Sequence, residues 1–102
     1  MVNEQDLYEI LTGTGLPVAY GHFKEPPAPP YLVYLFSFSL NFGADNKVYE
    51  RGNNYQVELY SNKKDLESEA LVESVLDTND IYWDKTETYI DSEGLYQVLY
   101  EI

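Results

Sequence analysis

Apolar and polar side chains alternate from residue 55 to residue 60, and the period of the pattern then changes. Tyr55, Val57 and Leu59 share one face of the alternating stretch, as in a strand with one buried side. After residue 61 the apolar positions recur three and four residues apart, which predicts a helix with Asn62 or Asp65 as its N-cap. The expected buried stripe of this helix excludes Glu69 and consists of Ser68, Leu71, Val72, Val75, Leu76 and Asn79. We expect this strand and helix to form the centre of the core.

The remaining patterns predict one more helix and five more strands. Residues 3–12 form the helix, with Asn3 as the N-cap and Gly13 in a left-handed C-cap conformation. Strands are expected at 16–23, 31–42, 47–51, 81–90 and 95–102, and turns at 43–46, 52–54 and 91–94, with Gly94 at positive φ. The order α-β-β-β-β-α-β-β predicts a single α+β domain, residues 1–102, with a mainly antiparallel sheet flanked by two helices.

Residues 31–42 form the strongest predicted strand. One face carries Leu32, Tyr34, Phe36, Phe38, Leu40 and Phe42. The other face begins with Val33 and Leu35 and continues with Ser37, Ser39 and Asn41. Because the first half is apolar on both faces, we expect it to lie centrally in the sheet.

A proline-rich segment, residues 24–30, precedes this strand. Pro26, Pro27, Pro29 and Pro30 favour an extended polyproline II arm. One interpretation is a rigid connector between two strands, which also touches a neighbouring subunit. The other is a ligand for a proline-binding module or a contact arm in an assembly. Its place between two strands favours the connector.

Composition narrows the classes of function. The chain has no cysteine, so disulfides and thiolate metal sites are excluded. No apolar run reaches the length of a membrane span, and no membrane partner is expected. Six basic and eighteen acidic side chains give a net charge of −12. Such a balance argues against specific nucleic-acid binding, while allowing DNA to pass nearby without sticking.

No pattern in the sequence argues for catalysis. His22 is the only histidine and has no partner base or thiol, so we expect a structural role. Asp77, Asp80 and Asp84 lack the spacing of a calcium loop. A pair formed by Glu87 and Glu93 is expected by chance among eighteen acidic residues. We therefore expect a protein that is not an enzyme and has no cofactor or metal.

The eleven tyrosines are more informative. Most of them fall in predicted strands, and a domain of this size cannot bury so many phenols with every hydroxyl satisfied. Some must then be exposed, and exposed tyrosines are enriched in protein interfaces. The alternative is that they lie half-buried at sheet edges. Either interpretation fits a binding or assembly protein better than an enzyme.

Several motifs together resemble small proteins encoded between the head and tail genes of long-tailed phages and prophages of Gram-positive bacteria. These proteins are called tail completion, tail terminator or head–tail joining proteins. Polar residues are more usual in them where this chain has Phe36-Ser-Phe-Ser-Leu40. The motifs are Gly15-Leu-Pro-Val-Ala-Tyr20, Pro26-Pro-Ala-Pro-Pro-Tyr-Leu-Val-Tyr34, Asn41-Phe-Gly-Ala-Asp-Asn-Lys-Val-Tyr49, Tyr55-Gln-Val-Glu-Leu-Tyr60, Lys63-Lys-Asp65, Glu87-Thr-Tyr-Ile90 and Leu95-Tyr-Gln-Val-Leu-Tyr100.

The resemblance implies a virion structural protein that oligomerises into a ring, usually of six subunits, at the head–tail junction or tail end. Its implied partners are copies of itself, the tail tube protein and a head-completion or connector protein. Its implied location is the virion, and the host cytoplasm during assembly. The interface candidates are Pro26, Pro27, Pro29, Pro30, Tyr31, Phe42, Asp45, Lys47, Tyr49 and Tyr60. The alternative is a small acidic binding or inhibitor module of phage origin that mimics DNA.

Overall fold

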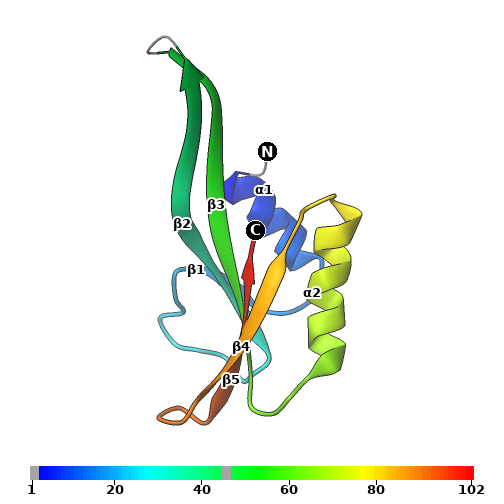
Figure 1. Ribbon diagram of the computed structural model, residues 1–102. Helices are drawn as coiled ribbons and strands as arrows, with labels where there is room; N and C mark the ends of the chain where they lie inside the picture. Colours follow the sequence, from blue (N-terminus) through cyan, green and yellow to red (C-terminus); the bar gives the residue numbers. More distant parts are fainter. Residues whose placement is uncertain (1–2, 45–46) are drawn as a thin grey trace.

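The computed structural model describes the backbone of residues 3–44 and 47–102, and the side chains of residues 3–37 and 54–102. Two helices and a five-stranded, mostly antiparallel sheet form an α+β fold, which confirms the predicted class (Figure 1). The order is α-β-β-β-α-β-β, one strand fewer before the second helix than predicted. The elements are α1 (Glu4–Thr12), β1 (Val18–Tyr20), β2 (Tyr31–Ala44), β3 (Lys47–Ser61), α2 (Leu66–Thr78), β4 (Asp84–Ile90) and β5 (Leu95–Glu101).

The strands lie in the order β1-β2-β3-β5-β4. Among the strand pairs of the described residues, only β1 and β2 are parallel, with Val18 opposite Leu32. The proline-rich segment makes the connection between them, as one interpretation of the sequence proposed, and it bends rather than running as an extended arm. The predicted hairpin of the last two strands is confirmed, and Gly94 in its turn has φ +64°.

Both helices cover the same face of the sheet. Leu7 and Leu11 of α1 pack in one cluster with Val72 and Leu76 of α2. The sheet contributes alternate residues of its central strands to this cluster, namely Leu32, Tyr34, Tyr55, Val57, Leu59, Val98 and Tyr100. The alternation predicted for residues 55–60 is therefore confirmed.

The buried stripe of α2 differs in phase from the prediction. Val72, Leu76 and Ser68 are buried as expected, whereas Leu71 is 40% exposed. Asn79 is also exposed and follows the end of the helix. Glu69, predicted to lie outside the stripe, is only 3% exposed. Burial of Glu69 is tolerated because Lys64 and Lys85 compensate the charge of its carboxylate.

The predicted N-caps are confirmed, but one C-cap prediction is wrong. Asn3 accepts a hydrogen bond from the Asp6 N–H at 2.8 Å. Asp65 accepts one from the Ser68 N–H at 3.0 Å. Gly13 has φ −62°, because its N–H still bonds the Ile10 carbonyl, and the left-handed turn comes at Gly15 with φ +81°.

Two other predicted strands are too long. β1 ends at Tyr20 because Gly21, at φ +75°, turns the chain away while donating its N–H to the Tyr34 carbonyl. β4 begins at Asp84 because the Ile81 N–H still bonds the Leu76 carbonyl at the end of α2.

The predicted turn at residues 52–54 is wrong, since β2 and β3 form one long hairpin. Gly52, Asn53 and Asn54 lie in β3 opposite Leu40, Ser39 and Phe38. The predicted turn at 43–46 is shorter, because Gly43 and Ala44 belong to β2, while Asp45 and Asn46 lie outside the described residues. The hairpin extends well beyond the rest of the sheet (Figure 1), and the molecule measures 50 × 29 × 24 Å.

Candidate interaction surfaces

The outer half of the long hairpin is a two-stranded ribbon. β1 accompanies β2 only from Leu32 to Tyr34, and β5 accompanies β3 only from Gln56 to Ser61. We call residues 38–44 and 47–53 the arm. In the described part of the fold, neither outer edge of the arm has a neighbouring strand. At about 3.4 Å per residue, each of its strands runs for about 24 Å.

The charge of the chain is distributed unevenly. Between residues 38 and 53, Lys47 and Arg51 balance Asp45 and Glu50. The rest of the chain holds the other four basic and sixteen acidic residues, so the full charge of −12 lies outside the hairpin end. The arm can therefore approach another acidic surface without net repulsion.

Aromatic side chains line a groove at the base of the arm. Tyr34 is buried, and Tyr20 packs edge-on against it with ring centroids 5.1 Å apart. The Tyr20 hydroxyl accepts a hydrogen bond from the Phe36 N–H at 3.2 Å. Tyr8 and Tyr20 remain 41% and 47% exposed. Burial raises the pKa of Tyr34, and the nearby Glu4 adds to this. Exposed rings above a buried one are typical of interface anchors.

The opposite face of the sheet carries a second aromatic group. Tyr31 stacks on Tyr60 at 5.2 Å, and Phe23 packs edge-on against Tyr31 at 5.3 Å. Tyr60 donates to Glu58 at 2.9 Å and accepts from Gln97 at 2.9 Å. Burial, opposed by the Gln97 hydrogen bond and reinforced by Glu58, raises the pKa of Tyr60 to about 12. Its hydroxyl is therefore neutral across the physiological pH range.

The predicted interface residues fall into two separate groups. Pro26, Tyr31 and Tyr60 line one small pocket of about 140 Å³ on this outer face. Pro27, Pro29 and Pro30 belong to the same connecting segment. The backbones of Phe42, Lys47 and Tyr49 lie in the arm, their side chains fall outside the described part, and Asp45 lies outside it entirely.

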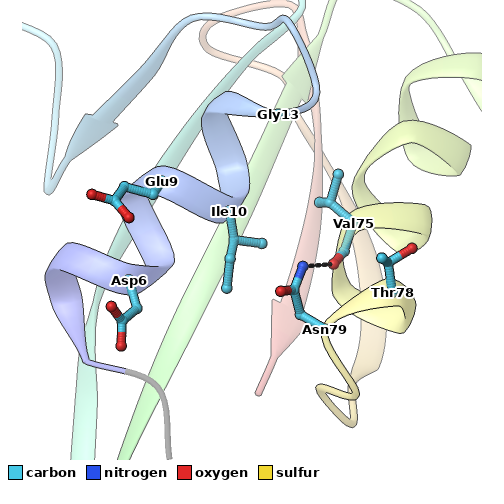
Figure 2. Close-up of a pocket in the computed structure, with 7 residues that line it drawn as sticks. All are labelled: Asp6, Glu9, Ile10, Gly13, Val75, Thr78 and Asn79. Atoms are coloured by element: carbon cyan, nitrogen blue, oxygen red, sulfur yellow. Dashed lines mark hydrogen bonds between the residues drawn. The ribbon is translucent and has the colours of Figure 1, made fainter.

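An open cleft lies between the two helices (Figure 2). Ile10 and Val75 meet across it, whereas the carboxylate of Glu9 points away from α2. Asn79 donates its side-chain amide to the Val75 carbonyl at 2.7 Å, which satisfies one carbonyl at the end of α2. The polar groups here stabilise the helices and do not converge on a common point.

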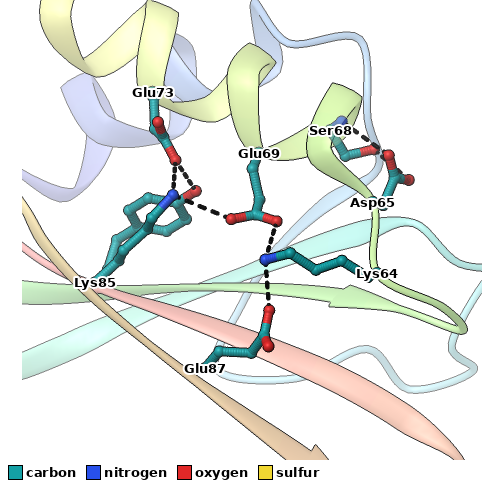
Figure 3. Close-up of polar contacts among 8 residues, drawn as sticks. Lys64, Asp65, Ser68, Glu69, Glu73, Lys85 and Glu87 are labelled. Carbon is teal, nitrogen blue, oxygen red and sulfur yellow. Dashed lines mark hydrogen bonds and ion pairs between the residues drawn. The ribbon is translucent and has the colours of Figure 1, made fainter.

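Ion pairs connect α2 to the edge strand β4 (Figure 3). Lys85 lies 3.1 Å from Glu69 and 2.7 Å from Glu73. Lys64 lies 2.6 Å from Glu69 and 2.6 Å from Glu87. The side chain of Glu69 is only 4% exposed and lies between the two lysines.

The protonation states of these groups are interdependent. Burial alone would raise the pKa of Glu69, but hydrogen bonds from Lys64 and Lys85 outweigh it, and the pKa is lowered. Hydrogen bonds to carboxylates raise the pKa of both lysines. Burial and the hydrogen bond that Tyr100 donates to Glu73 at 2.8 Å raise the pKa of that phenol. The cluster is charged and paired at neutral pH, which suits a structural role.

Two residues considered from the sequence for catalysis are either exposed or held in an ion pair. His22 is exposed, and Glu87 is held by Lys64. Among residues 3–44 and 47–102, no group of three or more potential ligands is placed to hold a metal ion. No helix in the same ranges is long and apolar enough to cross a membrane.

No model of a known protein family matches the chain, and no curated protein matches it either.

Sequence reasoning missed the ion-pair cluster and the groove tyrosines. Asp65, Glu69 and Glu73 recur every four residues along one side of the predicted helix, and Lys85 and Glu87 share one face of the predicted strand. That spacing is the signal that could have revealed the cluster. No comparable signal marks Tyr8 and Tyr20, since contact with Tyr34 depends on the packing of α1 and β1.

Proposed function

We propose that this protein is a virion structural protein that assembles with copies of itself into a ring, usually of six subunits. The ring lies at the head–tail junction or tail end of a long-tailed phage or prophage of Gram-positive bacteria. It contacts the tail tube protein on one side and a head-completion or connector protein on the other. The motifs described above support this placement by resemblance.

The observation that carries the proposal is the arm. An isolated two-stranded ribbon is at best marginally stable in water, because it buries little surface and leaves its edges to solvent. Long exposed edges also invite pairing with other chains. A ribbon of this length beyond a five-stranded sheet therefore fits a protein that is completed by association.

The charge distribution supports the same function. A ring at this position lets DNA pass through its lumen, and a lining rich in lysine or arginine would bind phosphates. The body of this protein instead carries all of the net negative charge. Repulsion keeps a duplex from adhering, although it fades beyond about 10 Å at ordinary salt.

An arm-less variant tests the proposal. An Asn-Gly hairpin turn replaces residues 38–53 and joins Ser37 to Asn54. We expect the variant to stay folded by circular dichroism but to sediment as a monomer at concentrations where the parent assembles. It should also fail to restore head–tail joining when supplied to a phage lacking the gene.

A matched variant in the connecting segment tests whether the interface between copies lies in the arm or in the proline segment. Replacing Pro26 and Pro27 by serine changes the predicted contact segment and leaves the arm intact. If this variant loses assembly while the arm-less one keeps it, the interface runs through the proline segment. A parent protein that remains monomeric at every concentration, with and without tube protein, refutes the assembly function.

A second candidate is an acidic inhibitor that binds a nucleic-acid enzyme in place of DNA. It is favoured by the concentration of the charge of −12 outside the hairpin end. It predicts that one host nuclease or polymerase subunit co-purifies with the protein, and that the arm-less variant binds it equally well.

A further inference from the structure

We propose that the arm of one copy pairs along the free edge of β4 in a neighbouring copy, adding its strands to that sheet. This inference rests on the proposed self-assembly and identifies the surface that receives the arm.

The β4 edge matches the arm in length and accessibility. β4 runs from Asp84 to Ile90, seven residues, and all of them except Ile90 are exposed. It is the outermost strand of the sheet and pairs only with β5 among the described elements. The β2 strand of the arm, residues 38–44, offers seven consecutive residues with a free edge, whereas the register shift at Tyr49 interrupts the other strand. Two edges of equal length can exchange a full ladder of backbone hydrogen bonds.

Lys85 and Glu87 of β4 do not protect its edge. Natural sheets often block an edge with lysine or other charges directed at an incoming strand. Here Lys85 is bound to Glu69 and Glu73 of α2. Glu87 is bound to Lys64. The charges of Lys85 and Glu87 are therefore directed to the helix side and paired. The opposite face of the strand carries Thr86 and Thr88, which suit strand pairing, and its one charge is Asp84 at the first position, which accepts a hydrogen bond from the Tyr82 hydroxyl at 3.1 Å.

The other edge of the sheet is a poorer receiver. β1 has only three residues, Val18–Tyr20. Pro17 precedes it, and Gly21 follows at φ +75°. A proline lacks the N–H that a ladder needs, and three residues give few hydrogen bonds.

Charge favours the arm over any other part of the chain as the strand that is added. The acidic body of one copy repels the body of the next, whereas the hairpin end is net neutral and carries Lys47 and Arg51. The contact joins two different surfaces of the same protein. Repeated head to tail, such a contact closes into a ring when the rotation between copies permits.

Cross-linking between two single-cysteine variants tests the pairing, because the chain contains no cysteine of its own. Ser39→Cys in the arm is mixed with Thr88→Cys in β4, and the mixture is treated with a short bis-maleimide. In the control, the Ser39→Cys variant is mixed with an Ala70→Cys variant, whose cysteine lies on the exposed side of α2. Proximity within an assembly raises effective concentration to the millimolar range, so we expect about tenfold more heterodimer with Thr88→Cys than with the control.

Hydrogen exchange gives a second measurement on the unmodified protein. Amides of β4 should exchange more slowly when assembly is promoted by concentration, while the exposed amides of Lys24, Glu25 and Ala28, the three residues of the 24–30 segment that are not proline, should not. An assembly that forms without either effect, or with equal cross-linking at Ala70, overturns the pairing and leaves the proposed function standing. Absence of any assembly instead refutes the proposed function and this inference with it.

Discussion

Glu69→Gln should destabilise the fold through the ion-pair cluster. The side chain is 4% exposed and lies 2.6 Å from Lys64 and 3.1 Å from Lys85. Glutamine has nearly the same shape but no charge, so it keeps the packing and weakens both contacts. The lysines keep their other partners, Glu87 and Glu73. The variant therefore isolates the contribution of one buried carboxylate.

The magnitude follows from the number and exposure of the contacts. A hydrogen bond to a charged group contributes about 1.5–3 kcal/mol. Two such bonds are weakened, but Lys64 and Lys85 are 46% and 38% exposed, and water compensates part of the loss. We expect a loss of about 1–3 kcal/mol in the free energy of unfolding. For a domain of this size each kcal/mol corresponds to about 4–8 °C in Tm.

The effect should depend on pH in a defined way. The folded pKa of Glu69 lies below its ordinary value of 4.5. Its stabilisation is therefore fully present above the unfolded value and is lost as pH falls through the folded pKa. The lysine pKa values lie above 10.5, so their share persists below that pH and is lost as pH rises through the raised values. The difference between parent and variant should form a plateau between these limits.

Urea unfolding followed by circular dichroism at several pH values measures this difference. The control is Glu25→Gln, which removes one exposed charge from the connecting segment. If Glu69→Gln and Glu25→Gln unfold at the same urea concentration at pH 7, the charge of the Glu69 carboxylate contributes nothing to stability. A difference that does not shrink at all as pH falls below 4.5 would show that the loss comes from packing rather than from charge.

Three further outcomes can be measured directly. Val72 is fully buried, so Val72→Asp should lower the free energy of unfolding by about 4 kcal/mol or more. Leu71 is on the exposed side of α2, and Leu71→Asp should change that free energy by no more than about 0.5 kcal/mol. Equal effects of the two substitutions in thermal melts would contradict the observed helix phase. Tyr100→Phe should lower the free energy of unfolding by about 1–2 kcal/mol, since Glu73 loses the hydrogen bond donated by the buried Tyr100 hydroxyl. An unchanged Tm would argue against a stabilising role of this hydrogen bond. Sedimentation should show assembly strengthening up to a few hundred millimolar salt, because screening reduces repulsion between acidic bodies, with no shift of duplex DNA at low salt. Dissociation on adding salt would point to a ring held by ion pairs.

Local signals predicted much of the fold. Asn3 and Asp65 were recognisable as N-caps because capping depends on residues three positions away. The alternation of residues 55–60 predicted which side chains are buried, since strand geometry alone sets that period. Such features need no knowledge of distant contacts.

The sequence-based predictions were wrong where contacts between residues far apart in the chain determine the structure. Residues 52–54 have turn composition, yet pairing with Phe38–Leu40 keeps them extended. The lengths of the two segments were the better signal, because residues 31–44 and 47–60 are equally long and lie on either side of one turn. The helical pattern alone predicts a solvated Glu69, because the lysines that pair with it come from β4 and from the 61–65 loop. The interface residues named from the sequence remain predictions, since no partner chain is present to contact either of the two groups that they form.

The place of β5 between β3 and β4 has a consequence for biosynthesis. The chain emerges from the ribosome from its N-terminal end at about 5–20 residues per second. α1, the long hairpin and α2 are therefore available before the strand that fills the space beside β3. Until β5 arrives, one edge of β3 is open and β4 has no neighbour in the described sheet. Nascent chains crowded on one message are thus exposed to mispairing in that interval, and slower elongation through residues 84–101 should raise the yield of aggregated product.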